Sequence, residues 1–183
     1  MTKALILIDI QTGFDAPFWG PRNNPDAEAN AARLLAHFRD QSRPVFHVMH
    51  LSTEHGSPLS GAGAAIKDIV APILGEPVVT KSVNAAFIGT DLETQLRARA
   101  ITDLTICGLT TPHCVSTTTR MAANLGFTVT LAHDACASFA RNADTSWSGA
   151  PAMTAQAIHD SAINHLHSEF ATARSVEDIL GHE

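Results

Sequence analysis

Short apolar runs alternate with longer amphipathic stretches along the chain. The runs are too short for typical helices, and several are rich in β-branched residues, so they predict strands that are buried on both faces. A further β-branched run, shorter than the others, ends at Lys81. The clear strands are predicted at residues 4–8, 45–51, 103–107 and 127–132, with a weaker one at 170–174.

Between these runs, apolar residues recur at the spacing of a helix face, and capping residues mark where helices begin. Asn24 is predicted to cap a helix that has Pro25 at its first position and continues through Phe38. Gly126 is predicted to end a helix that begins at Thr111. Further helices are predicted at residues 66–70, 90–96 and 154–167, and a short one follows the capping residues 175–178.

This alternation of strands and helices predicts a three-layer α/β/α fold with a Rossmann-like, mostly parallel sheet of five or six strands. A length of 183 residues suits one such domain, which we expect to span residues 1–183. Ligand sites in open parallel sheets lie beyond the carboxyl ends of the strands. The chemistry is therefore expected in the segments that follow the strands, at residues 9–14, 50–55, 108–114 and 133–139.

The composition is typical of a globular protein that does not bind its partners through bulk charge. Hydrophobic residues make up 45% and charged residues 16%, and the net charge is -6 at pH 7. This argues against nucleic acids and anionic membranes as partners held by bulk charge, and it leaves open a small-molecule substrate, including an anionic one held by one or two local cations. The first apolar run is too short for a signal peptide or a membrane span, and three cysteines do not make a disulfide framework. We therefore expect a cytoplasmic protein with reduced thiols.

Cys114 is the most informative position for chemistry. If Thr111 is the helix N-cap, Cys114 lies in the first turn, where free backbone N–H groups and the helix dipole favour a thiolate. This placement is typical of a nucleophile, and it predicts a thiol pKa below the ordinary value, although a nearby Asp9 carboxylate would oppose that fall. The alternative is an inert buried cysteine. Cys107, within a strand, and Cys136, in a loop after one, are better explained as small apolar fillers.

Asp9 and Lys81 are the polar residues that end two of the predicted strands. An acid directly behind a buried strand is costly without a partner, so Asp9 is either a turn cap or a general base near Cys114. A lysine after a short strand is often a solvated strand end. Lys81 gains a functional meaning only if it converges with the other two residues.

Three segments of the chain together resemble the signature regions of the isochorismatase-like cysteine hydrolases. They are LILIDIQTGF, TKSVNAAFIGTDLE and CGLTTPHCVSTTTRMAANLGF, and they occur in the family's order over nearly the whole chain. The superfamily includes nicotinamidases, N-carbamoylsarcosine amidohydrolases, ureidoacrylate hydrolases and isochorismatases. Its cysteine lies in a G-x-x-T-x-x-C-V pattern, which here runs from Gly108 to Val115 with the motif threonine at Thr111.

The resemblance implies a catalytic triad of Asp9, Lys81 and Cys114. It also implies a cis peptide bond between Leu109 and Thr110, and an oxyanion hole formed by the N–H groups of Thr110 and Cys114. Among the relatives, homodimers and homotetramers are common, so a homo-oligomer is expected, and no cofactor is implied. The expected reaction is hydrolysis of a small amide-type C–N bond through a thioester. The alternatives are vinyl-ether cleavage of the isochorismatase type and a catalytically silent binding protein on the same fold.

The histidines and aromatic residues near the motifs suggest a pocket more than a metal site. His50, Glu54 and His55 are close in sequence, but their spacing matches no standard metal site, so no metal is expected. The histidines of the late helix, at 159, 165 and 167, are interpreted as a solvated face. The residues expected to line the substrate pocket are Phe14, Trp19, His50, Phe87, Thr111 and His113.

Overall fold

The computed structural model describes residues 2–181 and contains one sheet of six strands in the order β3-β2-β1-β4-β5-β6, with every neighbouring pair parallel. This confirms the predicted parallel sheet. A sheet order that runs outward in both directions from the first strand is typical of doubly wound folds. The strands are β1 (Thr2–Ile8), β2 (Val45–His50), β3 (Val78–Lys81), β4 (Ile101–Leu109), β5 (Thr128–Ala137) and β6 (Thr172–Arg174).

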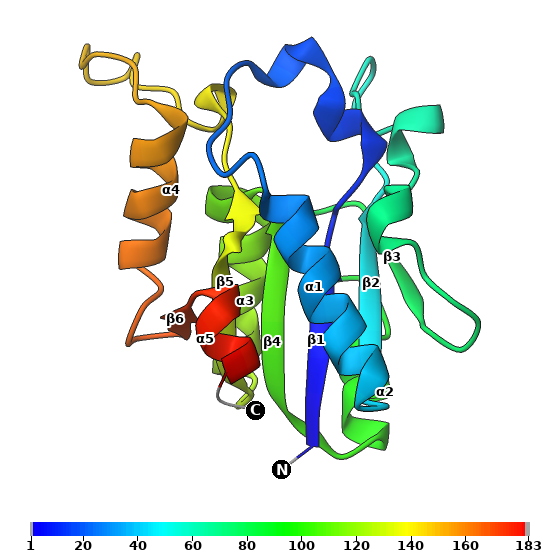
Figure 1. The fold of residues 1–183 in the computed structure, drawn as a ribbon. Helices are drawn as coiled ribbons and strands as arrows, with labels where there is room; N and C mark the ends of the chain where they lie inside the picture. The colour runs from blue at the N-terminus through cyan, green and yellow to red at the C-terminus, as the bar shows by residue number, and fades with distance from the viewer. Residues whose placement is uncertain (1, 182–183) are drawn as a thin grey trace.

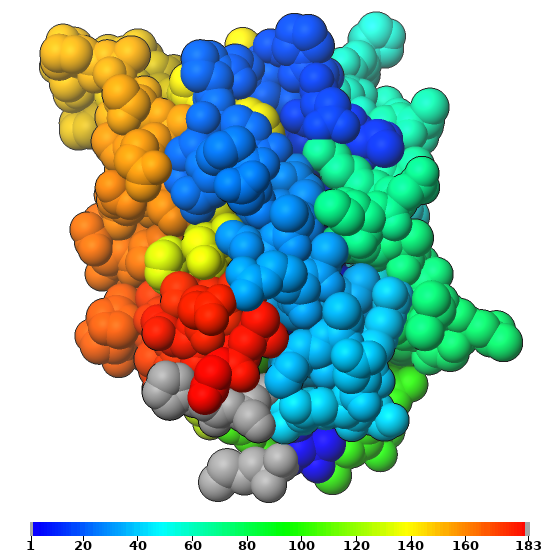
Figure 2. Space-filling view, in the orientation of Figure 1, coloured from blue at the N-terminus to red at the C-terminus, as the bar shows by residue number. Residues whose placement is uncertain are grey.

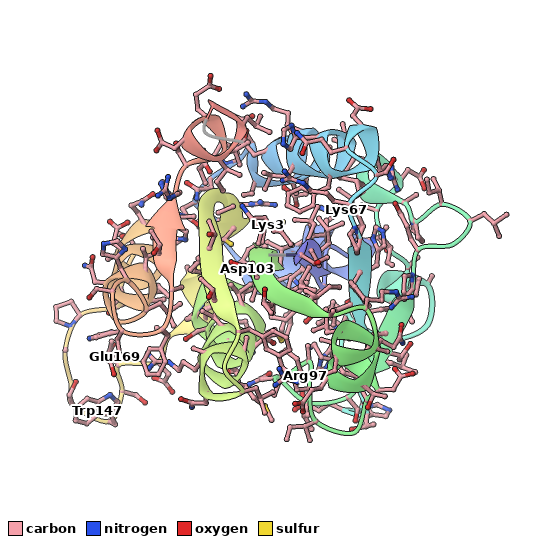
Figure 3. All side chains as sticks on the ribbon, turned by 90° about the horizontal axis from the view of Figure 1, so that it is seen from below. Lys3, Lys67, Arg97, Asp103, Trp147 and Glu169 are labelled. Atoms are coloured by element: carbon pink, nitrogen blue, oxygen red, sulfur yellow. The ribbon has the colours of Figure 1, made fainter. Side chains whose placement is uncertain are left out.

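Helices cover both faces of the sheet, which gives the three predicted layers. Figures 1 and 3 show α1 and α5 on one face and α2 and α3 on the other, with α4 on the β6 side of the molecule. In the space-filling view α1 and α5 close over the sheet face that they cover (Figure 2). The helices are α1 (Ala27–Asp40), α2 (Leu92–Ala98), α3 (Ser116–Asn124), α4 (Ala155–Asn164) and α5 (Val176–Gly181). Among residues 2–181, none of these helices has the length and apolar character needed to cross a membrane.

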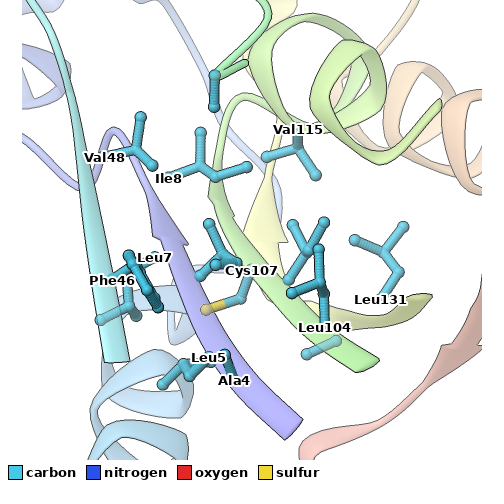
Figure 4. Close-up of a cluster of buried hydrophobic side chains, with 14 of the residues drawn as sticks. Ala4, Leu5, Leu7, Ile8, Phe46, Val48, Leu104, Cys107, Val115 and Leu131 are labelled. Carbon is cyan, nitrogen blue, oxygen red and sulfur yellow. The ribbon is translucent and has the colours of Figure 1, made fainter. Parts of the chain in front are cut away.

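The hydrophobic core lies between the sheet and the helices, as the sequence pattern predicts. All five residues from Ala4 to Ile8 are buried, because β1 lies in the middle of the sheet and is covered on both faces. Figure 4 shows these side chains packed with residues of β2, β4 and β5, and it shows Cys107 among them. Cys107 is therefore a core residue, as predicted.

The predicted N-cap of the first long helix is wrong. The helix begins at Ala27, after Asp26 rather than Asn24. Asn24 has a left-handed backbone (φ 42°), and its side-chain amide donates hydrogen bonds to the carbonyls of His133 and Cys136, at 3.2 and 2.8 Å. Asn24 thus ties the segment before α1 to β5 instead of capping the helix.

Strand β5 and the segment expected to form a helix at residues 66–70 also differ from the prediction. Strand β5 continues to Ala137 instead of ending at 132, so Cys136 lies in the strand and is fully buried. The short helix expected at residues 66–70 is replaced by two single 3-10 turns, Gly61–Ala64 and Asp68–Val70. The long connection between β2 and β3 therefore folds against the carboxyl edge of the sheet without a true helix.

Gly108 allows β1 and β4 to approach each other at this edge. Its φ of +130° is a conformation that L side chains rarely adopt, and an added Cβ would lie 2.0 Å from the Ile8 carbonyl oxygen. Ile8 and Gly108 are paired in the sheet register, one residue before Asp9 and six before Cys114. The glycine therefore brings the ends of the two central strands, and the residues that follow them, to one place.

Candidate active site

Asp9, Lys81 and Cys114 converge at the carboxyl edge of the sheet. Asp9 follows β1 with a left-handed backbone (φ 50°), and Lys81 ends β3. The Lys81 Nζ atom donates to Asp9 Oδ2 at 2.6 Å and to Cys114 Sγ at 3.2 Å. The Asp9 and Lys81 side chains are both 0% exposed, so this is a buried ion pair. The sequence prediction that these three residues meet is confirmed, although their catalytic roles remain a proposal.

Lys81 has a third acceptor at the same place. Its Nζ lies 3.0 Å from Nδ1 of His50, and burial together with the Lys81 charge lowers the His50 pKa to about 4. His50 is therefore neutral at pH 7, and its Nδ1 accepts the hydrogen bond from the ammonium. An ammonium group has three protons, and three acceptors surround it. Lys81 is thus fixed in position by Asp9, His50 and Cys114.

The pKa of the Cys114 thiol is raised to about 12, first by burial and then by the Asp9 charge, while Lys81 acts in the opposite direction. The prediction that the helix dipole lowers the thiol pKa below its ordinary value is therefore wrong, because desolvation and the neighbouring carboxylate outweigh the helix terminus and Lys81. Burial also raises the pKa of Asp9, against the effect of Lys81. The resting site holds a protonated thiol beside a carboxylate that is more basic than usual.

The Asp9 carboxylate has one free oxygen in the part of the chain that is described. Its Oδ1 is buried and accepts no hydrogen bond from an N–H or O–H donor among residues 2–181, and the Cys114 thiol is the group close enough to interact with the carboxylate beside Lys81. A ligand atom of Asp9, one of His50 and the sulfur of Cys114 all lie within 4.8 Å of one another. A buried acceptor without a donor is unfavourable unless function requires it. The free oxygen is therefore suited to receive a proton from the thiol or from a substrate.

The turn that carries Cys114 is a π-helical turn, Thr111–Val115, which continues into α3. Its N-cap is Thr110, not Thr111 as predicted, and the peptide bond between Leu109 and Thr110 is cis, as the resemblance implies. The Thr110 carbonyl accepts from the N–H groups of His113 and Val115, at 3.1 and 3.3 Å, on either side of Cys114.

Thr111 is held from outside the site by a buried histidine. Its Oγ1 lies 2.9 Å from Nδ1 of His159 in α4, and Thr111 is 0% exposed. The prediction that Thr111 lines the pocket is therefore wrong. His159 is also buried, with its pKa lowered to about 4 mainly by desolvation, so its assignment to a solvated face is wrong. His165 and His167 are exposed, as predicted.

A cavity of about 650 Å³ opens above Cys114. Four of the predicted pocket residues line it, namely Phe14, Trp19, His50 and His113, and so do both residues of the expected oxyanion hole, Thr110 and Cys114. Phe87 does not line it, because its ring stacks on Phe127 in the core, with centroids 6.1 Å apart. A cavity of this volume accommodates a small organic molecule.

Several cavity residues were missed by the sequence reasoning. Asn84, whose Oδ1 lies 3.6 Å from Cys114 Sγ, follows Lys81 closely within a segment that carries the family resemblance, and that proximity could have indicated it. Phe18 and Arg141 also line the cavity, but both lie in irregular segments whose course no local pattern reveals. Glu54 and His55 line the cavity as well.

Two aromatic side chains of the cavity lining, Phe14 and Trp19, lie in a segment that hydrogen bonds and ion pairs hold in place. Trp19 donates from Nε1 to the carbonyl of Gly13 at 2.9 Å. Lys67 bridges Asp15 and Glu28 at 2.6 and 2.9 Å, and Arg22 binds Glu28 through two contacts of 2.9 Å. These bonds lower the pKa of Glu28 to about 2 despite its burial. The loop that carries Trp19 is therefore anchored to α1.

The buried amide of Gln11 joins the floor of the site to the neighbouring loops. Its Nε2 donates to the carbonyls of His50 and Ala64, at 2.9 and 2.7 Å, and its Oε1 accepts from the His50 N–H at 2.8 Å. Three short bonds from one fully buried side chain hold the ends of β1 and β2 in a fixed relation. His50 is thereby placed beside Lys81.

The donor atoms of the site could in principle attract a metal ion. Asp9, His50 and Cys114 form the one group of potential ligands found close together in residues 2–181, and it includes neither Glu54 nor His55. The Lys81 ammonium already donates to all three members of that group. A metal ion would have to displace or neutralise this lysine, so the donor set fits a hydrogen-bonded triad better than a metal centre.

The family assignment follows from comparison with known sequences. The family described as "Isochorismatase domain" matches residues 3–178. The chain belongs to the isochorismatase family. Asp9, Lys81 and Cys114, which the resemblance in sequence singled out, are all present in this chain and lie in contact.

Individual relatives of this isochorismatase-family protein support the same assignment. The isochorismatase family protein YrdC of Bacillus subtilis is 43% identical over 181 residues, which cover 97% of this chain and 94% of that protein. A crystal structure of an isochorismatase-family protein from Chromobacterium violaceum aligns with a TM-score of 0.92 and 40% identity, covering 98% and 92% of the two chains. A streptothricin hydrolase of Streptomyces noursei is 33% identical over 147 residues, or 75% of this chain and 50% of its own length.

Proposed function

We propose that this protein hydrolyses a C–N bond of a small amide-type substrate through a thioester on Cys114. The observation that carries the proposal is the position of the Cys114 thiol. It lines the cavity, and it lies within reach of a buried Asp9 carboxylate whose second oxygen is free. A nucleophile next to a general base is the arrangement that covalent catalysis requires.

In the first half of the reaction, Asp9 accepts the thiol proton as the sulfur attacks the carbonyl carbon. The raised pKa of both groups favours transfer at the moment of attack over a resting thiolate. The N–H groups of Thr110 and Cys114 stabilise the oxyanion. The C–N bond then breaks, and Asp9 returns its proton to the leaving amine or ammonia.

In the second half, water enters the cavity and attacks the thioester. Asp9 accepts a proton from the water, and the sulfur leaves as its bond to the acyl carbon breaks. The proton returns to the sulfur, which restores the thiol and releases a carboxylic acid. Lys81 holds the carboxylate and the sulfur in position throughout and balances the negative charge that moves between them.

Other expectations from the sequence stay predictions. They are one domain spanning residues 1–183, a cytoplasmic location, a small-molecule substrate, and a homodimer or homotetramer. The reaction class has support from the relative named streptothricin hydrolase, although that name describes that protein alone.

The decisive experiment combines turnover with detection of the intermediate. A panel of small amides is assayed for ammonia release, and intact-protein mass spectrometry looks for an acyl adduct on Cys114. Cys114→Ala should abolish both signals, whereas Cys107→Ala, the same change at a buried core cysteine, should keep both. Full amidase activity in Cys114→Ala would refute the nucleophile. Turnover of a vinyl ether without any adduct would favour the isochorismatase type of reaction instead.

A further inference from the structure

Asn84 is a polar residue beside the nucleophile that the proposed mechanism does not use. It follows Lys81 in the segment before α2, and it lines the cavity, where it is exposed. Its Oδ1 accepts from the Cys114 thiol, at 3.6 Å from Sγ. No other hydrogen bond involves the Asn84 side chain among residues 2–181. This carboxamide therefore faces the reacting atom with the rest of its hydrogen-bonding capacity unused.

The backbone around Asn84 is fixed relative to Cys114. Thr118 lies four residues after Cys114 in α3 and is fully buried. Its hydroxyl accepts from the Ala86 N–H at 3.1 Å and donates to the Asn84 carbonyl at 3.5 Å. The side chain of Asn84 is thus presented to the sulfur by a loop that is tied to the helix following the nucleophile.

The carboxamide of Asn84 presents its oxygen to the sulfur, and the charges of the site explain why. Burial and the Asp9 charge raise the pKa of the thiol to about 12, so the thiol is protonated at pH 7 and acts as a donor. Lys81 already donates to the sulfur. An amide nitrogen in the same place would bring further N–H donors toward a sulfur that has accepted the ammonium, whereas an oxygen accepts the S–H.

The position of this oxygen decides which part of a substrate it can bind. In a productive complex the carbonyl carbon lies about 3–3.5 Å from the attacking sulfur. An atom 3.6 Å from the same sulfur is therefore close to the substituents of that carbon. The carbonyl oxygen is an acceptor and is repelled by Oδ1, and the acyl carbon forms no strong hydrogen bond. The amide N–H is the substituent that an acceptor binds.

We propose that Asn84 Oδ1 accepts a hydrogen bond from the N–H of the scissile amide, so that this site selects amides with at least one N–H over esters and N,N-disubstituted amides. This inference rests on the proposed amidase function for the reaction itself. An ester places an oxygen against Oδ1 with no proton between them, and that mismatch disfavours it. Asn84 is then a specificity-determining residue for the reacting group.

The same contact also prepares the thiol for attack. When the substrate N–H occupies Oδ1, the thiol loses Asn84 as an acceptor, and the free oxygen of Asp9 is the acceptor that remains for its proton. Binding of an amide therefore directs the thiol proton toward the general base, whereas binding of an ester does not.

Matched substrates test this selection. Each acyl group of the panel is prepared as a primary amide, an N,N-dimethylamide and a methyl ester, for example benzamide, N,N-dimethylbenzamide and methyl benzoate. The measured quantity is the ratio of kcat/KM for the primary amide to kcat/KM for each of the other two compounds. Their intrinsic reactivities cancel when this ratio is compared between variants of the protein.

Asn84→Leu keeps the approximate size of the side chain and removes its oxygen. It should lower both ratios about tenfold to hundredfold, as expected when a hydrogen bond to the reacting group is lost. Asn84→Asp keeps an acceptor of the same shape without the amide donors, so it should preserve the ratios even if its charge slows turnover. Ser82→Ala, the matched control at another polar residue of the same loop that lines the cavity, should also preserve them. The inference is overturned if Asn84→Leu keeps the wild-type ratios, or if Asn84→Asp lowers them equally.

A binding arm separates this inference from the proposed function. The chain has two tryptophans, and with Trp147→Phe only Trp19, which lines the cavity, is left to report on binding by its fluorescence. Cys114→Ala is added so that no compound is consumed. In this background Asn84→Leu should weaken binding of the primary amide relative to its methyl ester.

The two arms together assign every outcome. Absence of turnover for every amide, with an Asn84-dependent preference for amides in binding, would refute the amidase and preserve the inference. Turnover of amides with ratios and binding preferences that Asn84→Leu leaves unchanged would refute the inference and preserve the amidase. If no primary amide is turned over or binds saturably, both are refuted.

Discussion

Replacing Lys81 with methionine tests whether the buried ion pair organises the site. The ammonium and the Asp9 carboxylate are 2.6 Å apart and both 0% exposed. Coulomb's law at that distance gives about 6 kcal/mol of attraction with an effective dielectric constant of about 20. Proton uptake by Asp9 limits the loss, so we expect Lys81→Met to lower the free energy of unfolding by about 3–5 kcal/mol at pH 8, as for other broken buried pairs.

The stability that Lys81→Met loses relative to the wild type should increase with pH. Burial already raises the pKa of Asp9 above 3.8, and Lys81 is the main influence that opposes this rise. Without Lys81 the folded pKa of Asp9 rises further above its unfolded value. A group of this kind contributes stability at low pH that is lost as the pH rises through its folded pKa. The difference between Lys81→Met and the wild type should therefore grow from pH 5 to pH 8.

Urea unfolding at pH 5, 6.5 and 8 measures the free energy of unfolding of the wild type, Lys81→Met, Asp9→Asn and the double variant. The double variant should be more stable than Lys81→Met at pH 8, because a neutral amide needs no counter-charge. The reasoning fails if Lys81→Met matches the wild type in stability at pH 8. It also fails if the double variant unfolds as readily as Lys81→Met does.

Three further predictions follow from features of the site and its supports. Iodoacetamide at pH 8 should label Cys114, which lines the cavity, well before the fully buried Cys107 and Cys136, and equal rates by mass spectrometry would contradict the assignment. Gly108→Ala should reduce the soluble yield or lower the melting temperature by several degrees, because its Cβ would lie 2.0 Å from a backbone oxygen at a φ of +130°. Glu28→Gln should lower the free energy of unfolding by about 1–3 kcal/mol at pH 7, because it weakens the bonds to Arg22 and Lys67. The pKa of Glu28 is lowered from 4.5 to about 2, so the stability difference measured by chemical denaturation should shrink as the pH falls across that interval.

The strands could be predicted from the sequence because their causes are local, whereas the triad was implied by the resemblance to a known family. A parallel strand buried on both faces reads as a continuous apolar run, and polar residues that follow such runs meet at one edge of the sheet. Strand β5 was predicted too short, because His133 and Asp134 interrupt the apolar run while the backbone stays extended. Asp134 is in fact used there, since its carboxylate accepts from the Val176 N–H at the start of α5.

The errors concern contacts between distant segments. In the sequence, His159 is one of several polar residues of its helix. Its burial depends on contact with Thr111, in the turn that follows β4, and only the structure shows that contact. Asn24 has the sequence of a helix cap, but the nearby carbonyls of β5 compete for its amide. The thiol pKa of Cys114 was predicted to fall because a helix terminus is visible in the sequence, whereas the depth of burial is not.

The three hydrogen bonds of the Gln11 amide have a consequence for how this enzyme family can diversify. They fix the site to the central strands, whereas the segment at residues 52–59, which lines the cavity, has mostly local hydrogen bonds. Substitutions or insertions in that segment can therefore change which molecules enter without disturbing Asp9, Lys81 and Cys114. A directed-evolution library confined to residues 52–59 should yield new specificities at higher frequency than one directed at Gln11 and its neighbours, where most changes would abolish turnover of every substrate.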